Sequence, residues 1–481
     1  MAGAALLAGP VLLAFDSGGT GVSTQAAGAV LAFGLLVVLA LLASWPLVER
    51  SWPLYALGAL AALCAWTALS ASWSPALGDA VNDADRVGFY VAAFALAVVV
   101  MRAPAVRRVT PDALMWGVLV VALYALAGRL LPDVVEVKRA PVAGDRLDQP
   151  LTYWNAMGIL MGFGVLLATA VAADERRPLA YRAAACAAAV PCALACYLSF
   201  SRASWAAVVA GVAVLLLVRP RLAPALAAWL WGAAVVVLAL ALRAFPAALH
   251  LDRGADAQAS DGLPVALLCV GLAVAVGVAF ALVVRRREAA VRSPAPATSG
   301  PPPGPTFARP HGWLAAAAVA VVLGAGLAVS FATERTEDIS KSAARVTTLK
   351  TYRGEYWRVA LRSFADHPVG GVGTAGFQVE WIREREERVF AFDAHSLYIE
   401  TLAELGIVGF ALLAAFAACV AGGLRRHFRA APGDPLLAAG AAVLGAFAVH
   451  AGMDWDWEMP AVTLPALLLA AACVQRPAPS G

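Results

Sequence analysis

Residues 153–173 read YWNAMGILMGFGVLLATAVAA and contain no charged side chain. A stretch of about 17 to 25 apolar residues is long enough to cross the hydrocarbon core of a membrane as one α-helix. Similar stretches recur along the 481 residues, of which 61% are apolar or aromatic and 14% are charged. The sequence therefore predicts an all-α, polytopic transmembrane helix bundle, and it excludes a conventional soluble, disordered or collagen-like protein.

Fourteen stretches are long and apolar enough to be candidate spans, so we expect about 12 to 14 membrane crossings. They lie near residues 2–15, 25–43, 53–70, 87–101, 112–128, 153–173, 180–199, 203–218, 223–243, 263–284, 313–331, 397–421, 435–452 and 460–474.

The distribution of Lys and Arg predicts the orientation of these spans. If the N-terminus is cytoplasmic, 18 of the 36 cations fall in inside loops and 18 outside. Ten of the outer cations lie in one long loop, residues 332–395. Long loops cross regardless of charge, so the short-loop comparison is 18 inside against 8 outside. Both termini are therefore predicted to be cytoplasmic.

The chain is expected to divide into spans, a linker and an outer cap. The loop 332–395 carries ten cations and ten anions, which favours a folded, partly helical cap. Residues 293–310 are rich in Pro, Ser and Gly, which is typical of a flexible linker. The predicted regions are N-terminal spans 1–144, central spans 145–284, a cytoplasmic Pro-rich linker 285–312 and C-terminal spans 313–475.

Composition also narrows the classes of ligand. The net charge of +4 leaves no nucleic-acid footprint. The seven cysteines fall almost entirely inside apolar runs, where Cys packs as a small hydrophobe, so no zinc site or disulfide framework is predicted. Near the C-terminus, Asp454, Asp456 and Glu458 alternate with two Trp residues. This segment is either an aromatic belt at the membrane edge or a site for a divalent cation or sugar hydroxyls.

Polar residues at span ends mark candidate binding residues on the outer side. Arg202 lies in a very short connection between two spans. Its guanidinium could either reach the lipid headgroups or hold a phosphate in a bidentate fork. Asn155 lies one helical turn into an apolar run, where it must find a partner in a neighbouring helix or in a substrate.

The predicted cap and the span that follows it contain further candidates. Arg353 and Trp357 are four residues apart and share one helical face. Glycines between residues 370 and 376 permit positive φ and close backbone approach, as a phosphate-cradling turn would require, although a glycine cluster alone is a weak signal. His395 precedes a span, where the helix dipole favours the neutral imidazole that a general base needs. Glu404 lies deeper in that span and is expected to face the bundle interior or a cavity.

Taken in order, these segments resemble the O-antigen ligase and polymerase superfamily of bacterial envelope glycosyltransferases. The resemblance covers roughly residues 145–425. It rests on Trp-Asn-Ala-Met-Gly at 154–158, Ser-Arg-Ala-Ser-Trp at 201–205, Arg-x-x-x-Trp at 353–357, His-Pro-x-x-Gly-x-Gly at 367–373, His-Ser-Leu-Tyr at 395–398 and Glu-Leu-Gly-Ile-Val-Gly at 404–409.

The resemblance implies a multi-pass enzyme of the bacterial plasma membrane with its active site on the extracytoplasmic face. Such enzymes move a glycan from a polyprenyl diphosphate carrier to a hydroxyl of a lipid, glycan or protein acceptor. It further implies that His395 is the base that activates the acceptor and that Arg202 and Arg353 hold the diphosphate. On this view no metal or cofactor takes part, and the anomeric carbon is inverted.

Other residues enter as secondary candidates. Arg146 and Arg358 are further candidates for binding the donor diphosphate. Candidates for an acceptor contact or a structural role are Asn155, Trp357, Glu404, Asp454, Asp456 and Glu458.

Two departures from the family and three alternatives stay open. Many relatives have Asn where this chain has Ser396, and fourteen predicted spans exceed the twelve usual for the ligases.

A polymerase, or a ligase acting on protein or a wall polymer, would use the same chemistry. A transporter or flippase of an anionic or lipid-linked sugar is the alternative from another class, but no inverted repeat or matched pair of broken spans is apparent. A structural scaffold would leave the outer Arg and His residues unexplained.

Overall fold

The computed structural model describes residues 2–42, 51–137, 141–292, 352–386 and 389–475, and within them it contains helices and no β-strand. The α-helices are α1 Ala2–Ala14, α2 Val22–Leu42, α3 Trp52–Ser70, α4 Leu77–Val100, α5 Pro104–Leu130, α6 Trp154–Ala172, α7 Leu179–Leu198, α8 Arg202–Val218, α9 Leu222–Ala244, α10 Pro246–Leu249, α11 Ala255–Arg292, α13 Arg353–Asp366, α14 Phe377–Glu384, α15 Leu397–Ala430, α16 Pro435–Ala451 and α17 Pro460–Val474.

The predicted fold class is confirmed. Thirteen of the fourteen predicted spans coincide with one of these helices. The remaining predicted span, near residues 313–331, lies outside the described residues. The linker 293–310 and the first part of the predicted cap also lie outside them. Among the described helices, α2, α3, α5, α6, α7, α9, α11 and α15 are long and apolar enough to cross a membrane, and four apolar helices are shorter. The chain is a multi-pass membrane protein.

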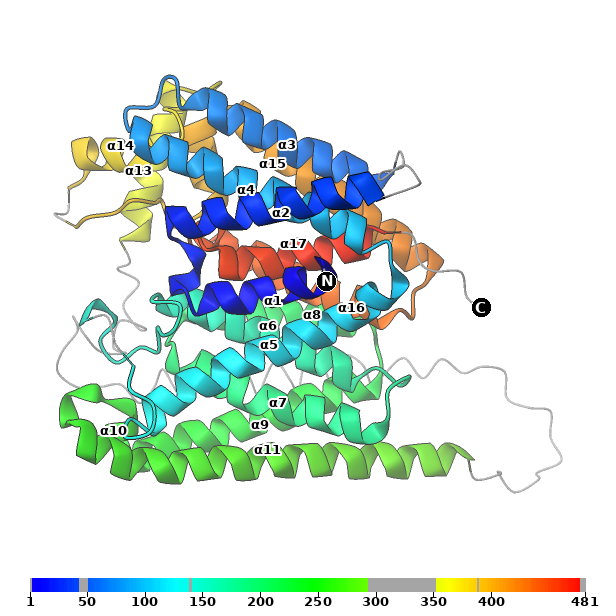
Figure 1. Cartoon of the computed structure of the whole chain (residues 1–481). Coiled ribbons are helices and arrows are strands. Elements are labelled where there is room, and N and C mark those ends of the chain that lie inside the picture. The colour runs from blue at the N-terminus through cyan, green and yellow to red at the C-terminus, as the bar shows by residue number, and fades with distance from the viewer. Residues whose placement is uncertain (1, 43–50, 138–140, 293–351, 387–388, 476–481) are drawn as a thin grey trace.

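The helices stack in layers across the bundle (Figure 1). At one edge α3 packs on both α15 and α4, and α17 lies between α4 and α15. The middle is formed by α6, α8 and α16, which contact one another. At the other edge α7, α9 and α11 pack together, with α7 joined to α6. Because α6 and α17 lie in the interior, their side chains are buried almost without exception.

Small residues in α6 set the position of α8. Gly158 and Gly162 lie one turn apart, and neither has a side chain to hold the neighbouring helix away. A Cβ atom at Gly158 would lie 2.5 Å from Ser204 Oγ, and one at Gly162 would lie 2.7 Å from a methyl group of Val208. Close helix contact through small residues is a common packing mode in membranes. It brings the start of α8 against the start of α6, beside Asn155.

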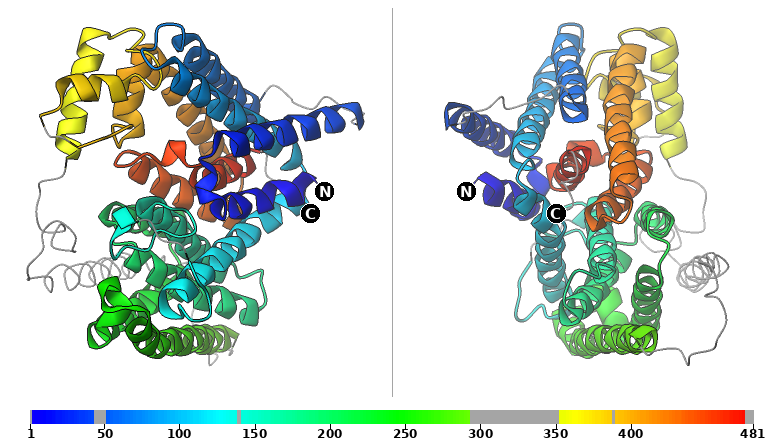
Figure 2. Two further views of the ribbon diagram at one scale, coloured as in Figure 1. Left: turned by 60° about the vertical axis from the view of Figure 1, so that its left-hand side comes forward. Right: turned by 90° about the vertical axis from the view of Figure 1, so that its right-hand side faces the viewer.

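The described part of the cap, α13 and α14, packs beside α15 at one end of the bundle (Figure 2). It has its own small apolar core, in which Tyr356, Phe377 and Trp381 are buried. Below the cap, α15 is interrupted at Gly406, whose φ is 64° and ψ is −165°. The helix axis is therefore broken where the cap meets the bundle.

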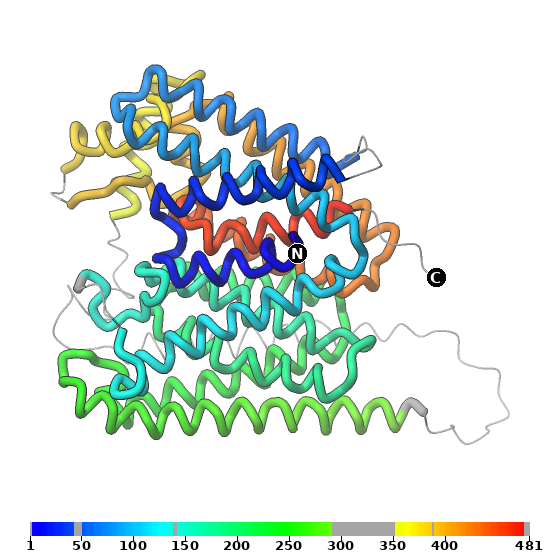
Figure 3. The backbone as a smooth tube through the Cα atoms, viewed as in Figure 1, coloured from blue at the N-terminus to red at the C-terminus, as the bar shows by residue number. Residues whose placement is uncertain are grey.

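The connections between helices collect at two opposite ends, as the backbone trace shows (Figure 3). One end, called here the cap end, carries α13, α14 and the connections 71–76, 131–137, 141–153, 199–201 and 452–459. The opposite end carries the connections 101–103, 173–178, 219–221 and 431–434. This partition follows the predicted sidedness of the loops. Which end faces the cell exterior stays a prediction.

Candidate functional site

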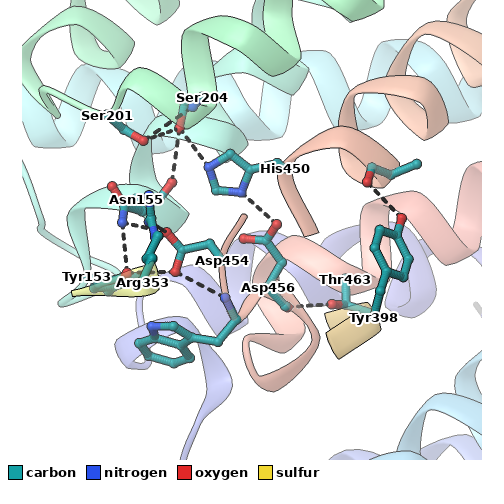
Figure 4. A network of polar contacts seen from close by, with 12 residues as sticks. Tyr153, Asn155, Ser201, Ser204, Arg353, Tyr398, His450, Asp454, Asp456 and Thr463 are labelled. Atoms are coloured by element: carbon teal, nitrogen blue, oxygen red, sulfur yellow. Dashed lines mark hydrogen bonds and ion pairs between the residues drawn. The ribbon is translucent and has the colours of Figure 1, made fainter. Parts of the chain in front are cut away.

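The polar centre of the cap end is Asp454, which lies fully buried between α16 and α17 (Figure 4). Its Oδ2 accepts hydrogen bonds from Arg353 Nη2 at 2.8 Å and from Asn155 Nδ2 at 2.5 Å. Its Oδ1 accepts from Tyr153 Oη at 2.7 Å and from the Trp455 backbone N–H at 3.0 Å. Burial opposes ionisation of this carboxyl, but the positive charges around it prevail and hold the pKa of Asp454 below its usual value.

Two arginines lie in the region of this carboxylate, one bound to it and the other within electrostatic reach of the first. Arg353 begins α13, and its side chain is 27% exposed. Within the described part of the chain, Asp454 is the acceptor that it contacts, so most of its five N–H donors stay available to a ligand. Arg202 begins α8 and lies near enough to Arg353 for their positive charges to repel. Two adjacent guanidiniums suit a dianionic, phosphate-like group.

His395 approaches the same centre from the cap. It directly precedes Ser396, whose side chain caps α15, and its ring stacks on Tyr356 with centroids 5.2 Å apart. Its Nδ1 lies 3.0 Å from the backbone oxygen of Asp393. A carbonyl oxygen can only accept, so in the neutral ring Nδ1 carries the proton and Nε2 keeps its lone pair. The electrostatic influence of His395 on the pKa of Asp454 places both residues in one site.

A second, fully buried histidine lies behind this site. His450 Nδ1 is 2.6 Å from Asp456 Oδ2, and its Nε2 is 3.1 Å from Ser204 Oγ. Ser204 in turn donates to Ser201 Oγ at 2.8 Å or to Asn155 O at 3.3 Å. The order Ser–His–Asp resembles a nucleophilic triad, but all three side chains are sealed inside the bundle. This chain of hydrogen bonds joins α8 and α16 to the turn that carries Asp454.

Two residues predicted from the sequence support the centre from α6 and the preceding loop. Asn155 uses its amide to hold Asp454 and Tyr153, so it pins helices together. The Arg146 guanidinium stacks over Trp154 at 4.4 Å from the ring centroid. The rings of Trp154 and Tyr153 are 5.0 Å apart, which links Arg146 to the centre through aromatic contacts.

The three acids at 454, 456 and 458 do not form one cluster. The interpretation as an exposed aromatic belt is wrong for Trp457, which is buried with its ring centroid 5.0 Å from that of Tyr90. The acids face three different cationic or titratable partners: Asp454 faces Arg353, Asp456 faces His450 and Glu458 faces Arg86.

Arg86 belongs to a neighbouring acidic pocket. Its guanidinium pairs with Asp83 at 2.8 Å and with Glu458 at 3.3 Å. Asp393, Glu400 and Glu458 offer carboxylate oxygens within 4.8 Å of one another, a spacing that could hold a metal ion. Burial raises the pKa of Asp393 to about 6 and that of Glu458 to about 8, so these carboxyls can also be accommodated as proton-bearing groups.

Glu404 binds backbone N–H groups of the cap. Its carboxylate accepts the N–H groups of Ala375 and Phe377, both at 3.0 Å. Every backbone N–H from residue 371 to residue 377 has an acceptor within the protein. A Cβ atom at Gly371 would lie 2.3 Å from the Glu404 backbone, and one at Gly406 would lie 2.2 Å from Val369 O. The interpretation of this loop as a phosphate cradle is therefore wrong, because its donors are already used: four bind residues of α15, one binds Ser70 of α3 and two bind within the loop. We call residues 367–377 together with Glu404 and Gly406 the glycine junction.

Two predicted residues lie elsewhere on α13. Arg358 is exposed and pairs with Glu386 at 3.3 Å and Glu355 at 3.8 Å, so the structure does not bring it to the Asp454 centre. Trp357 lies one turn after Arg353 and packs against the cap core. Its indole N–H is buried and has no hydrogen-bond partner within the described residues.

The sequence interpretation missed several residues of this site. It assigned no role to Tyr153, His450 or Arg86. The available signal was a polar residue next to an apolar run, which Tyr153 and His450 both satisfy. Nothing in the sequence indicates that Arg86 faces Glu458, because 371 residues separate them along the chain.

Comparison with known proteins bears on part of this region. Residues 266–414 match the family model described as O-antigen ligase. The matched range contains Arg353, His395 and Glu404 and ends before Asp454. It falls inside the range of about 145–425 over which the sequence resembled that superfamily. No curated protein matches the chain.

Proposed function

We propose, from the premise that this membrane protein contains an O-antigen ligase domain, that it transfers a glycan from a polyprenyl diphosphate carrier to a hydroxyl acceptor. The observation that carries the proposal is that Arg353 and His395 both act on buried Asp454, while the charge of Arg202 acts on Arg353. The cations suit a diphosphate leaving group, and the imidazole suits removal of a hydroxyl proton.

The reaction is a direct displacement at the anomeric carbon. The acceptor oxygen forms a bond to that carbon while His395 Nε2 takes the hydroxyl proton. The bond from the carbon to the diphosphate oxygen breaks, and its electron pair stays on the departing diphosphate. Attack opposite the leaving group inverts the anomeric carbon. A positioned base contributes about 10²- to 10⁴-fold in rate.

Arg353 is proposed to stabilise the charge that develops on the leaving group. Asp454 accepts one hydrogen bond from its guanidinium and thereby orients the group. The remaining N–H donors can then bind the leaving group. Arg202 adds a second positive charge from α8. Preorganised donors aimed at developing charge are effective because they need no rearrangement during the reaction.

The fixed tautomer of His395 supports its proposed role. The carbonyl of Asp393 occupies Nδ1, and Tyr356 supports one face of the ring. His450 lacks this freedom because both of its ring nitrogens are already engaged. His395 is therefore the better base of the two histidines.

The cap end is proposed to face the cell exterior, with both termini in the cytoplasm. Short loops of the opposite end carry the excess of Lys and Arg, which favours the inside. A lipid-linked donor and an acceptor hydroxyl would then meet on the outer face of the bacterial plasma membrane.

The test is glycan transfer by the purified protein in detergent, with a polyprenyl diphosphate glycan and candidate acceptors. We expect His395→Ala to lower the rate about 10²-fold or more. His250→Gln, a half-exposed histidine paired with Asp145, is the matched control and should keep the rate. Detergent removes the closed compartment that transport requires, so product formation also separates an enzyme from a flippase. Full activity of well-folded His395→Ala would refute the assigned base.

A further inference from the structure

A cavity lined by both charged and apolar side chains lies at the end opposite the cap. It has a volume of about 670 Å³. Its walls come from the start of α5, the end of α6, the turn before α7, and the start of α16. Asn155 at the candidate site and Ala172 beside this cavity are separated by 17 residues of α6, or about 26 Å at 1.5 Å per residue. The two sites are therefore separate.

Arginines dominate the charge of this cavity. Arg107, Arg108, Arg176 and Arg177 line it, against Asp174 and Asp434. Four guanidiniums and two carboxylates leave an excess of two positive charges at the lining. Asp112, behind Arg177, reduces this excess to one.

Within the described residues, Asp174, Asp434 and Asp112 pair with Arg176 and Arg177, whereas Arg108 has no paired carboxylate. Arg176 Nε lies 3.1 Å from Asp174, and Arg177 Nε lies 3.4 Å from the same carboxylate. Arg108 is exposed, and no carboxylate within the described residues pairs with its guanidinium. The cavity thus has cationic donors to offer to an anion.

A buried arginine beside the cavity adds to this imbalance. Arg219 follows α8, is 6% exposed, and lies close enough to Asp174 and Arg176 for their charges to act on it. Its Nε and Nη1 atoms are buried without a hydrogen-bond partner in the described part of the chain. A buried guanidinium with unused donors is costly unless an anion or water completes it.

The uncapped N-terminus of α5 also favours an anion in this cavity. Pro104 is the first residue of α5, and no side chain caps the preceding Ala103 position. The first backbone N–H groups of a helix lack intrahelical acceptors, and the dipole there is positive, so an uncapped start favours anions. In contrast, α16 is capped by Asp434, which accepts from the Leu436 N–H.

The remaining walls are apolar. Pro111, Val171, Leu436 and Ala439 line the cavity beside the arginines. A group that combines a phosphate with a hydrocarbon chain would match both parts of the lining. We infer that this cavity binds a phosphate group, carried in the membrane by a lipid, at the end of the protein opposite the glycosyl-transfer site. The inference does not depend on the transfer chemistry.

The test is binding of defined phosphate probes to the full chain in nonionic detergent. Phosphatidylglycerol in mixed micelles tests lipid-borne phosphate, phosphatidylcholine tests the zwitterionic form, and inorganic pyrophosphate tests a free anion. The apparent Kd comes from the rise of the thermal unfolding temperature with probe concentration. We expect phosphatidylglycerol to bind more tightly than phosphatidylcholine.

The variants are Arg107→Gln/Arg108→Gln and, because Arg107 is buried, exposed Arg108→Gln alone. We expect the double variant to weaken Kd about 10-fold or more, and the single variant to weaken it by a smaller factor. Arg285→Gln/Arg286→Gln, exposed on α11, is the matched control and should keep the parent Kd.

The outcomes separate the sources of phosphate. Loss of phosphatidylglycerol binding in both test variants supports a lipid-borne phosphate. Loss of pyrophosphate binding alone supports a phosphate site but overturns its occupation by lipid. Equal Kd values for parent, test variants and control with every probe would overturn the site altogether.

Discussion

The Asp454 site and the glycine junction lie at the same end of the bundle, yet they use polar groups in opposite ways. In the glycine junction, each backbone N–H from residue 371 to residue 377 already has an acceptor. In the Asp454 site, Arg353 commits one nitrogen to the carboxylate, and His395 commits one ring nitrogen to a carbonyl. Both side chains therefore retain capacity for a ligand.

This difference distinguishes a region that stabilises the fold from a region that can bind a ligand. Both regions attract notice in the sequence, one through glycines and the other through Arg and His. A saturated network fixes backbone position, and its disruption should act mainly on folding. A partly satisfied network held by a buried carboxylate can bind and release another group, so its disruption should act mainly on transfer.

The largest expected effect comes from filling the glycine junction. Gly406→Ala places a Cβ atom 2.2 Å from Val369 O at a residue whose φ is 64°. The positive φ costs about 1–2 kcal/mol, and the steric clash costs roughly 1–3 kcal/mol more. We expect loss of most folded protein, measured by the yield of monodisperse protein in detergent. Gly433→Ala, where a Cβ meets nothing within 4 Å, is the control. Normal yield and stability of Gly406→Ala would contradict the structural role.

The next effect is expected at Arg353. Arg353→Lys keeps a positive charge for Asp454 but loses the planar fork that can hold two phosphate oxygens. We expect the transfer rate to fall roughly 10- to 100-fold with the fold retained, as for loss of one charge-assisted hydrogen bond. Arg358→Lys on the same helix should change the rate less than about twofold, since exposed Arg358 pairs with Glu355 and Glu386 of the cap and not with Asp454. Equal losses of rate in the two variants would contradict a specific role of Arg353 in transfer.

The smallest effect concerns pH and the pocket around Arg86. Burial raises the pKa of Glu458 to about 8, from an ordinary value near 4.5. Between these values the folded state holds a proton that the unfolded chain has released, so stability should fall as pH rises through this window. Glu458→Gln should flatten the pH dependence of the thermal unfolding temperature between pH 5 and 8 by about 1–3 °C.

Glu380→Gln on the cap surface is the control for that experiment, since it pairs with exposed Arg383. It should preserve the parent slope of unfolding temperature against pH. A Glu458→Gln profile parallel to the parent profile would show that this carboxyl is ionised in the folded protein.

Much of the fold followed from the pattern of apolar residues. Helix positions were predictable because about 17 to 25 apolar residues in a membrane must satisfy their backbone hydrogen bonds internally. The matching of α6 and α15 with predicted spans 153–173 and 397–421 illustrates this. The break at Gly406 was not predicted, since a single glycine in an apolar run is also compatible with an unbroken helix.

The candidate site was only partly predictable. His395, Arg353 and Arg202 were identifiable because cations and titratable groups are costly near apolar spans and therefore stand out. The partners of these residues were not. Glu404 was expected to face the bundle interior or a cavity, and it does line a cavity of about 40 Å³, but its capping of the glycine junction depends on a loop brought beside it by the chain fold.

By itself, the sequence determined that this chain is a multi-pass bundle of helices, because hydrophobicity and backbone hydrogen bonding are local requirements. It also determined which few polar residues are available at the ends of the spans. Only the tertiary structure decided that Arg353, Asn155 and Tyr153 share the carboxylate of Asp454, while Glu404 serves the backbone. The physical reason is that a hydrogen bond depends on position in space, and helices far apart in the chain supply its two partners.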